Sequence, residues 1–312
     1  MKIGLLLPTR EAVLTESPDA GALVELAERA EEAGFDSVWA GDSLLARPRF
    51  EPLTLLAAVA ARTRRVELGT AVLVAPLRNP VLLAHACATV DQVARGRLIL
   101  GIGFGAKGPA TRHEFAMAGT EYEHRATSMR EQMEICRLLW SGEEVSYEGK
   151  FWQLEKARML PKPFRPGGPP LWVGGSGPTA IRLTARHADG YFPNSGSPGL
   201  LRESWQAVQQ GASGRKTPLL ALYSSVNVGP DKPLAKRELE AFIERYYNAP
   251  YEAISKRQGC VAGSAEECAA WLAGYIEQGV EHLVLRLASN NQAEQFQRVV
   301  SELLPRLREM SA

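Results

Sequence analysis

Short apolar runs alternate with amphipathic helical stretches along almost the whole of this 312-residue chain. The runs are rich in branched side chains and end near glycine or proline, which is typical of buried strands. The stretches between them carry apolar residues three and four positions apart, as a helix packed against a sheet does. Eight strands are predicted, at residues 2–7, 35–41, 66–74, 97–103, 171–173, 190–193, 219–228 and 282–287.

Helices are predicted between these strands and after the last one. Two of them have a capping-box spacing at their start, at residues 120–123 and 264–267. Residues 143–169 interrupt the alternation with a short hairpin and a proline-rich exit. The helices are predicted near residues 23–34, 52–63, 80–94, 120–140, 178–188, 199–210, 232–257, 264–279 and 296–307.

The order of these elements favours an α/β fold, a (β/α)8 TIM-type barrel with an insertion before strand 5. Two helix-to-strand joints, at residues 30–38 and 275–283, both end a helix with glycine and enter a strand through an acidic residue. Such units close a barrel because each buries its apolar face only against its neighbours. The competing doubly wound sheet normally begins with a glycine-rich fingerprint, and residues 8–10 are not one. Residues 1–312 are therefore predicted to form a single barrel domain with an insertion at about 143–169.

Composition excludes several classes of protein. The chain has 36 Lys and Arg and 35 Asp and Glu residues, and its net charge is +1. It therefore lacks the excess of positive charge that proteins binding nucleic acid or an anionic membrane carry. No apolar run approaches the roughly 18–20 residues that span a bilayer, and the N-terminal run is too short for a signal peptide. The four cysteines form no CxxC pair and have no histidine at ligand spacing. This pattern predicts reduced thiols in a cytoplasmic protein and no metal site.

The sharpest local signal for a ligand is the glycine-rich turn after the fifth predicted strand. Gly174, Gly175 and Gly177 surround Ser176, and Pro178 stands at a favourable first helical position. Glycine allows a backbone to approach an anion closely, and the free N–H groups of the following helix point at that anion. The turn therefore predicts a phosphate cradle, although a tight strand-to-helix turn without a ligand has the same sequence.

Alternating glycines at the end of the fourth strand have two interpretations. Gly101, Gly103 and Gly105 could leave room for a flat ring system, or they could allow neighbouring elements to pack closely. The spacing is not that of a dinucleotide fingerprint, and residues 107–109 are not predicted to open a helix.

Other polar residues are predicted near strand ends, where barrel enzymes carry their sites. Asp42 could hydrogen-bond a ligand or cap a helix, and residues 78–80 are interpreted as a helix cap. His113 and His124 lie in or beside the long loop after the fourth strand, where they could contact a substrate. The remaining histidines are interpreted as structural, at positions 85, 187 and 282.

The sequence contains no hydrolase triad, zinc motif, P-loop or paired carboxylates. A site rich in glycine and poor in acid–base groups suits a redox enzyme whose cofactor carries the chemistry. Here the chain resembles the bacterial luciferase-like flavin-dependent oxidoreductases. The resemblance is carried, in order along the chain, by residues 35–42, 68–72, 78–80, 96–103, 140–149, 161–163, 173–176 and 263–287.

This resemblance implies a bound cofactor, either FMN or the deazaflavin coenzyme F-420. Its ring would lie over the strand ends and its phosphate at the glycine-rich turn. The resemblance also implies a β-bulge with a non-proline cis peptide between Ala71 and Val72, and a contact between Asp42 and the ring. The implied cofactor-binding residues are Asp42, Thr70, Ala71, Val72, Gly103, Gly174, Gly175, Ser176 and Gly177.

The activity implied by the resemblance is that of an oxidoreductase or monooxygenase acting on a small organic molecule. Members either split oxygen with reduced FMN, which a flavin reductase partner would supply, or pass hydride through F-420, and members are often homodimers. Residues 41–43 and 121–125 resemble the F-420 branch a little more than the FMN branch. Two alternatives stay open: a flavin-binding protein without turnover, and an unrelated barrel isomerase or lyase acting on a phosphorylated substrate.

The chain departs from those relatives that oxidise sugar phosphates. They have a histidine and a glutamate where this chain has Ser43 and Ala106. A hydroxyl group and a methyl group cannot take up an alcohol proton as those side chains do, so poor alcohol oxidation is expected. The remaining candidates for proton donation are Tyr122, His113 and Arg286.

Overall fold

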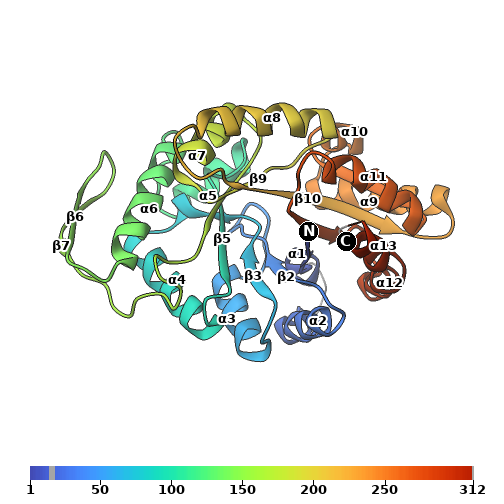
Figure 1. The fold of residues 1–312 in the computed structure, drawn as a ribbon, viewed down its shortest axis with the longest axis horizontal. Coiled ribbons are helices and arrows are strands. Elements are labelled where there is room, and N and C mark those ends of the chain that lie inside the picture. Colours follow the sequence, from blue (N-terminus) through green and yellow to red (C-terminus); the bar gives the residue numbers. More distant parts are fainter. Residues whose placement is uncertain (14–17, 311–312) are drawn as a thin grey trace.

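The computed structural model describes residues 1–13 and 18–310, and its parallel strands close into a barrel (Figure 1). Strand β1 pairs with β2 on one side and β12 on the other, and β9 pairs with β10 to complete the ring. The predicted (β/α)8 barrel is therefore confirmed. Around the ring, the strands among the described residues are β1 (Lys2–Leu6), β2 (Ser37–Ala40), β3 (Glu67–Thr70), β5 (Leu98–Gly103), β8 (Leu171–Gly174), β9 (Gly190–Phe192), β10 (Leu219–Val228) and β12 (His282–Leu287).

Helices surround this barrel and alternate with its strands (Figure 1). Apolar side chains such as Leu5, Val38 and Leu68 fill the layer between strands and helices. No helix of the described part of the chain is long and apolar enough to cross a membrane. The helices are α1 (Thr9–Val13), α2 (Ala20–Glu32), α3 (Pro52–Arg62), α4 (Pro80–Ala94), α5 (Pro109–Met117), α6 (Arg125–Trp140), α7 (Pro178–His187), α8 (Pro198–Gly211), α9 (Lys232–Tyr247), α10 (Tyr251–Ser255), α11 (Ala265–Ile276), α12 (Gln292–Arg298) and α13 (Leu304–Glu309).

The third barrel strand is interrupted by a bulge, so it is divided into β3 and β4 (Leu73–Val74). Leu68 pairs with Leu98, whereas Leu73 pairs with Ile102. The β3–β4 segment therefore has one residue more than β5 between these two pairs, which defines a β-bulge. The peptide bond between Ala71 and Val72 is cis, as the family resemblance implied.

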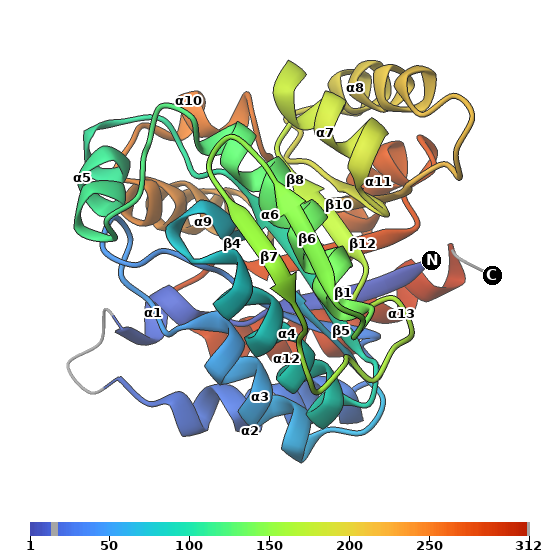
Figure 2. The same cartoon turned by 90° about the vertical axis from the view of Figure 1, so that its left-hand side faces the viewer.

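The insertion before the fifth barrel strand is also confirmed. It forms an antiparallel hairpin of β6 (Val145–Glu148) and β7 (Gln153–Ala157) outside the barrel. Figure 2 shows this hairpin lying across α6. The backbone N–H groups of Lys150 and Phe151 donate to the buried carboxylate of Glu131 on α6, which fixes the hairpin tip on that helix.

Two predictions about the segment after β5 are wrong. Helix α5 does begin at Pro109, because Gly108 adopts a φ of 137° that turns the chain and Pro109 takes the first helical position. The next helix, α6, begins at Arg125 rather than Thr120, and its N-cap His124 makes no side-chain capping bond. The backbone N–H of Thr120 instead donates to Phe115, which ends α5.

The predicted single helix over 232–257 is also wrong. Asn248 adopts a left-handed conformation with a φ of 50° and ends α9, and Pro250 precedes the short α10. The sequence analysis did not predict the strand that follows, β11 (Gly259–Gly263), which pairs with the C-terminal half of β10 outside the ring. The capping box predicted at Ser264 is present at the start of α11.

The barrel interior contains one buried histidine, His282, among aromatic rings. Its ring lies edge-on to Trp39 and Trp172, and its Nε2 is 2.7 Å from Ser37 Oγ. Burial, and to a smaller extent Lys2, lowers the pKa of His282 from 6.5 to about 3. The structural role predicted for this residue agrees with its position in the core.

This histidine predicts a stability that falls in mild acid. The folded protein keeps His282 neutral, whereas the unfolded chain binds a proton below pH 6.5. Its contribution to the free energy of unfolding is complete above pH 6.5 and falls by roughly 1.4 kcal/mol per pH unit towards pH 3. Urea unfolding should show an extra loss of about 2 kcal/mol between pH 7 and pH 5 compared with His282→Gln. An identical pH dependence in the two proteins would contradict this expectation.

Candidate functional site

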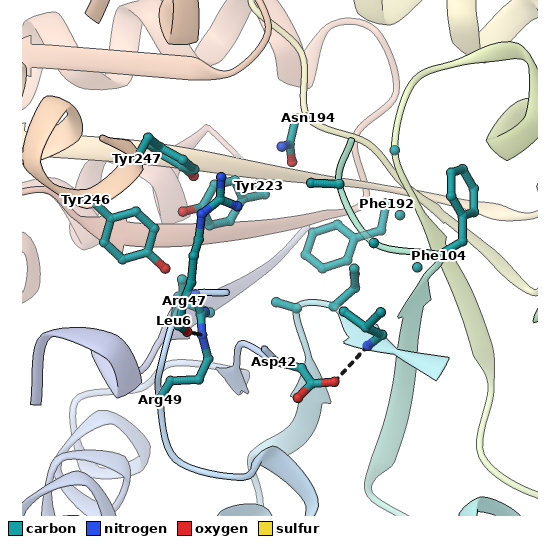
Figure 3. A pocket seen from close by; sticks show the side chains of 18 residues that line it. Leu6, Asp42, Arg47, Arg49, Phe104, Phe192, Asn194, Tyr223, Tyr246 and Tyr247 are labelled. Atoms are coloured by element: carbon teal, nitrogen blue, oxygen red, sulfur yellow. Dashed lines mark hydrogen bonds between the residues drawn. The ribbon is translucent and has the colours of Figure 1, made fainter. Parts of the chain in front are cut away.

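A cleft of about 340 Å³ opens at the C-terminal ends of the barrel strands (Figure 3). Its lining comes from the strand ends, from the loops after β2 and β5, and from the end of α9. The lining residues are Leu6, Asp42, Arg47, Arg49, Ala71, Val72, Val74, Gly103, Phe104, Gly105, Ala106, Gly174, Gly175, Phe192, Asn194, Tyr223, Tyr246 and Tyr247.

Most of the predicted cofactor-binding residues meet at this cleft. Those that line it are Asp42, Ala71, Val72, Gly103, Gly174 and Gly175. Three others do not line it. The Thr70 side chain is buried and its hydroxyl donates to the Gly101 carbonyl at 2.6 Å. Ser176 and Gly177 are exposed in the β8–α7 turn, and Ser176 lines a neighbouring hollow that shares Asn194 with the cleft.

The glycines at the strand ends pack against the bulge. A Cβ on Gly101 would collide with the carbonyl oxygen of Thr70. A Cβ on Gly103 or Gly174 would lie 2.8 or 2.9 Å from a methyl carbon of Val72. These two glycines therefore allow close packing against the bulge. Gly103 and Gly105 also line the cleft, so the room for a flat ring stays a prediction. Val72 is held between two strands, and it lines the cleft.

The β8–α7 turn has the geometry that an anion cradle requires. Gly175 has a φ of 104°, which favours glycine, and α7 begins at Pro178. The N-cap of α7 is Gly177, which has no side chain to cap the helix, whereas Ser197 caps the next helix through its hydroxyl. The first N–H groups of α7 thus have no side-chain cap among the described residues. The residues present fit a phosphate group, because uncapped N–H groups and the helix dipole attract an anion.

Asp42 lies at the edge of the cleft and holds the bulge in place. Its Oδ2 accepts hydrogen bonds from Val74 N at 2.8 Å, drawn in Figure 3, and from Arg78 Nη1 at 2.6 Å. Arg78 also donates to Glu51 at 3.0 Å, and the neighbouring Asn79 caps α4. The Asp42 carboxylate is therefore a positioning group for β4, and the interpretation of residues 78–80 as a cap agrees with the structure.

The three candidates for proton donation lie outside the cleft lining. The Tyr122 hydroxyl is 3.4 Å from the Ala106 carbonyl oxygen, and His113 is exposed on α5. Arg286 is buried behind the cleft, where it donates to Glu11 at 2.6 Å and to the hydroxyl of Tyr223 at 3.2 Å. Tyr223 itself lines the cleft, so Arg286 reaches the site through this hydroxyl.

One known protein family matches most of the chain. A family model described as luciferase-like monooxygenase matches residues 1–282. The chain belongs to this family. An F-420-dependent glucose-6-phosphate dehydrogenase from Nakamurella multipartita is 32% identical, over 92% of this chain and 92% of the relative. The prediction of an F-420- or FMN-dependent oxidoreductase is confirmed at the level of this family, and an unrelated isomerase or lyase barrel is excluded.

Solved structures share the fold of this luciferase-like protein. An F-420-dependent secondary alcohol dehydrogenase, in complex with an F-420–acetone adduct, has a TM-score of 0.83 and 22% identity, with 98% of this chain and 99% of that chain covered. A monooxygenase from Streptomyces bottropensis has a TM-score of 0.82 and 23% identity, with the same coverage. Both similarities concern the fold of the barrel.

Glu114, which supports this luciferase-like site, was not predicted from the sequence. Glu114 on α5 is buried, and its carboxylate accepts from Ser43 Oγ at 2.8 Å and from the Leu45 and Ala46 N–H groups. It thereby fixes the loop after β2, which carries Arg47 into the cleft. A helix had to be predicted at residues 109–117 before Glu114 could be placed there.

Proposed function

We propose that this luciferase-like protein is an F-420-dependent oxidoreductase that transfers hydride between the deazaflavin and a small organic molecule bound in the cleft. One observation carries the proposal. The glycine-rich β8–α7 turn, whose helix has no side-chain cap, and the bulge at Ala71–Val72 lie at the same cleft. The dependence of the 32% identical relative on F-420 supports the choice of cofactor.

The residues of this chain would hold the cofactor at two places. The N–H groups of Gly175–Gly177 would bind the phosphate, and Val72 would support the ring from the bulge side. When bound, F-420 supplies hydride transfer, and the protein supplies orientation and a partly closed site. Asp42 would keep Val74 and therefore the bulge in position, because it holds the Val74 N–H.

Four finer expectations stay part of this proposal. The protein would act as a homodimer in the cytoplasm, residues 1–312 would fold as one barrel domain, and a flavin reductase would be required only if FMN replaced F-420. The described cysteines are all unpaired, which supports a reducing compartment.

The experiment that tests the proposal is a parallel titration of the apoprotein with F-420 and with FMN, followed by fluorescence. Saturable binding of F-420 that is at least about tenfold tighter than that of FMN is expected. Tighter binding of FMN would replace the proposal with an FMN-dependent monooxygenase. Binding of F-420 without turnover of any activated alkene, imine or carbonyl compound would instead indicate a flavin-binding protein.

A further inference from the structure

Three arginines gather on one side of the cleft. Arg47 and Arg49 line it from the loop after β2, and Arg10 follows β1 on α1. The guanidinium carbons of Arg10 and Arg49 lie 4.8 and 5.9 Å from the centre of the Tyr246 ring, and that of Arg47 lies 5.4 Å from the Tyr247 ring. Figure 3 shows Arg47 and Arg49 beside Tyr246, on the side of the cleft away from Phe104.

These arginines lack anionic partners in the described part of the chain. No ion pair involves any of the three, and Nε and Nη1 of Arg10 are buried without a hydrogen-bond acceptor. The nearby carboxylates have other partners, because Glu11 pairs with Arg286 and Asp42 with Arg78. Burial lowers the pKa of Arg10. Tyr246 opposes this shift, and the charges of Arg49 and Arg47 add to it.

An unpaired cluster of this kind is costly unless a ligand completes it. Like charges in a partly buried site repel each other, and buried guanidinium N–H groups without acceptors lose hydrogen bonds that water would give. Arginine also presents planar donors that suit the oxygens of a carboxylate or phosphate. The tyrosine rings beside the cluster add a flat, mostly apolar surface.

We propose that Arg47 and Arg49, with Arg10 adding its positive charge from behind them, form a subsite for an anionic group, carboxylate or phosphate, carried by the substrate. This inference deepens the proposed function, and it rests on that function in assigning the anion to the substrate.

The barrel order assigns the subsite to the substrate rather than to the cofactor. In the ring of strands, β8 is four positions from β1 and three from β2. The phosphate cradle after β8 and the arginines after β1 and β2 therefore lie on opposite sides of the barrel mouth. A cofactor whose phosphate is bound after β8 and whose ring lies at the bulge would not occupy the side of the cleft that carries the arginines. That side is therefore open to the substrate.

The test compares a carboxylate with its neutral isostere on the F-420-loaded protein. Isothermal calorimetry with benzoate should give saturable binding that is at least about tenfold tighter than that of benzamide. Arg47→Gln and Arg49→Gln should each weaken benzoate binding by about tenfold or more and leave benzamide binding unchanged. The control is Arg306→Gln on exposed α13, which removes the same charge far from the cleft and should bind benzoate as the parent does.

Equal binding of benzoate and benzamide, or unchanged binding in both variants, would overturn the inference. Thermal melting identifies a variant that fails to fold, and Arg47→Lys then replaces it, with weaker benzoate binding than the parent expected because the planar fork is lost. The source of the anion is tested with F-420 trimmed of its glutamate tail. If Arg47→Gln and Arg49→Gln weaken the binding of complete F-420 but not the binding of the trimmed form, the tail occupies the subsite. The assignment of the subsite to the substrate is then wrong.

The same titrations, with the benzoate series repeated on the apoprotein, separate this inference from the proposed function. Benzoate binding that depends on the arginines in a protein that binds no F-420 would overturn the proposed function and support an anion subsite. Tight F-420 binding with no preference for benzoate would support the proposed function and overturn the subsite.

Discussion

Replacing Gly175 with valine should weaken F-420 binding by about a hundredfold or more. The φ of 104° at this position is strained for any residue with a Cβ, and a branched side chain would cover the N–H groups of the β8–α7 turn. A Cβ there would lie at an ordinary contact distance of 3.5 Å from the Cβ of Ala180, so the Cβ itself meets no clash. Fluorescence titration of parent and variant with F-420 measures the change in the dissociation constant.

The matched control for this variant is Gly214→Val. Gly214 has a φ of 84° and open space around its Cβ position, and it lies in an exposed turn after α8. The control therefore imposes a similar backbone strain away from the cleft. If Gly175→Val bound F-420 as tightly as the parent and Gly214→Val did, the phosphate would be anchored elsewhere.

Oxidation of alcohols should be slower than reduction of an activated double bond by about 10²- to 10⁴-fold in kcat/KM. This is the factor that a lost general acid or base typically costs. Ser43 points its hydroxyl at Glu114, and Ala106 carries only a methyl group, so neither position offers a proton acceptor to the cleft. Glucose 6-phosphate and isopropanol supplied with oxidised F-420, and cyclohexenone supplied with reduced F-420, provide the comparison.

Glucose 6-phosphate is the informative member of this set. Its phosphate carries the charge that the proposed arginine subsite would bind, so it should compete with benzoate for binding and yet be oxidised poorly. Efficient oxidation at neutral pH that survives Ser43→Ala would show that another group takes the proton.

Much of the barrel could be predicted because local pattern and tertiary packing agree there. The strands at 219–228 and 282–287 and the helix at 80–94 have the predicted bounds. Each strand is buried on both faces, so its apolar run is continuous, and each helix has one apolar stripe. The insertion was visible because its prolines and its alternating hairpin interrupt that pattern.

Elements that depend on single backbone conformations were not predictable in the same way. The end of α9 was signalled by Asn248 and by Pro250 two residues later, a pattern that the prediction of one helix overlooked, whereas Gly108 required a φ that only the fold reveals. The short β11 pairs with the far end of β10, a contact set by the closed ring rather than by its own five residues.

The candidate site was predicted where the chain itself carries the signal, and missed where separate segments meet. The glycine-rich turn is a local feature of the sequence, and the position of the bulge was implied by the family resemblance. Arg10, Arg47 and Tyr246 come from three distant segments and meet only because β1, β2 and α9 end at the same side of the barrel mouth. Tyr246 is mostly buried on α9 and also lines the cleft.

The most direct measurement of the central claim is a crystal structure of the protein with F-420 bound. The account predicts the phosphate on the N–H groups of Gly175–Gly177, the ring against Val72, and the arginines after β1 and β2 free to face a second ligand. A phosphate bound instead by Arg47 and Arg49, with the β8–α7 turn empty, would contradict both the anchoring and the assignment of the arginine side to the substrate.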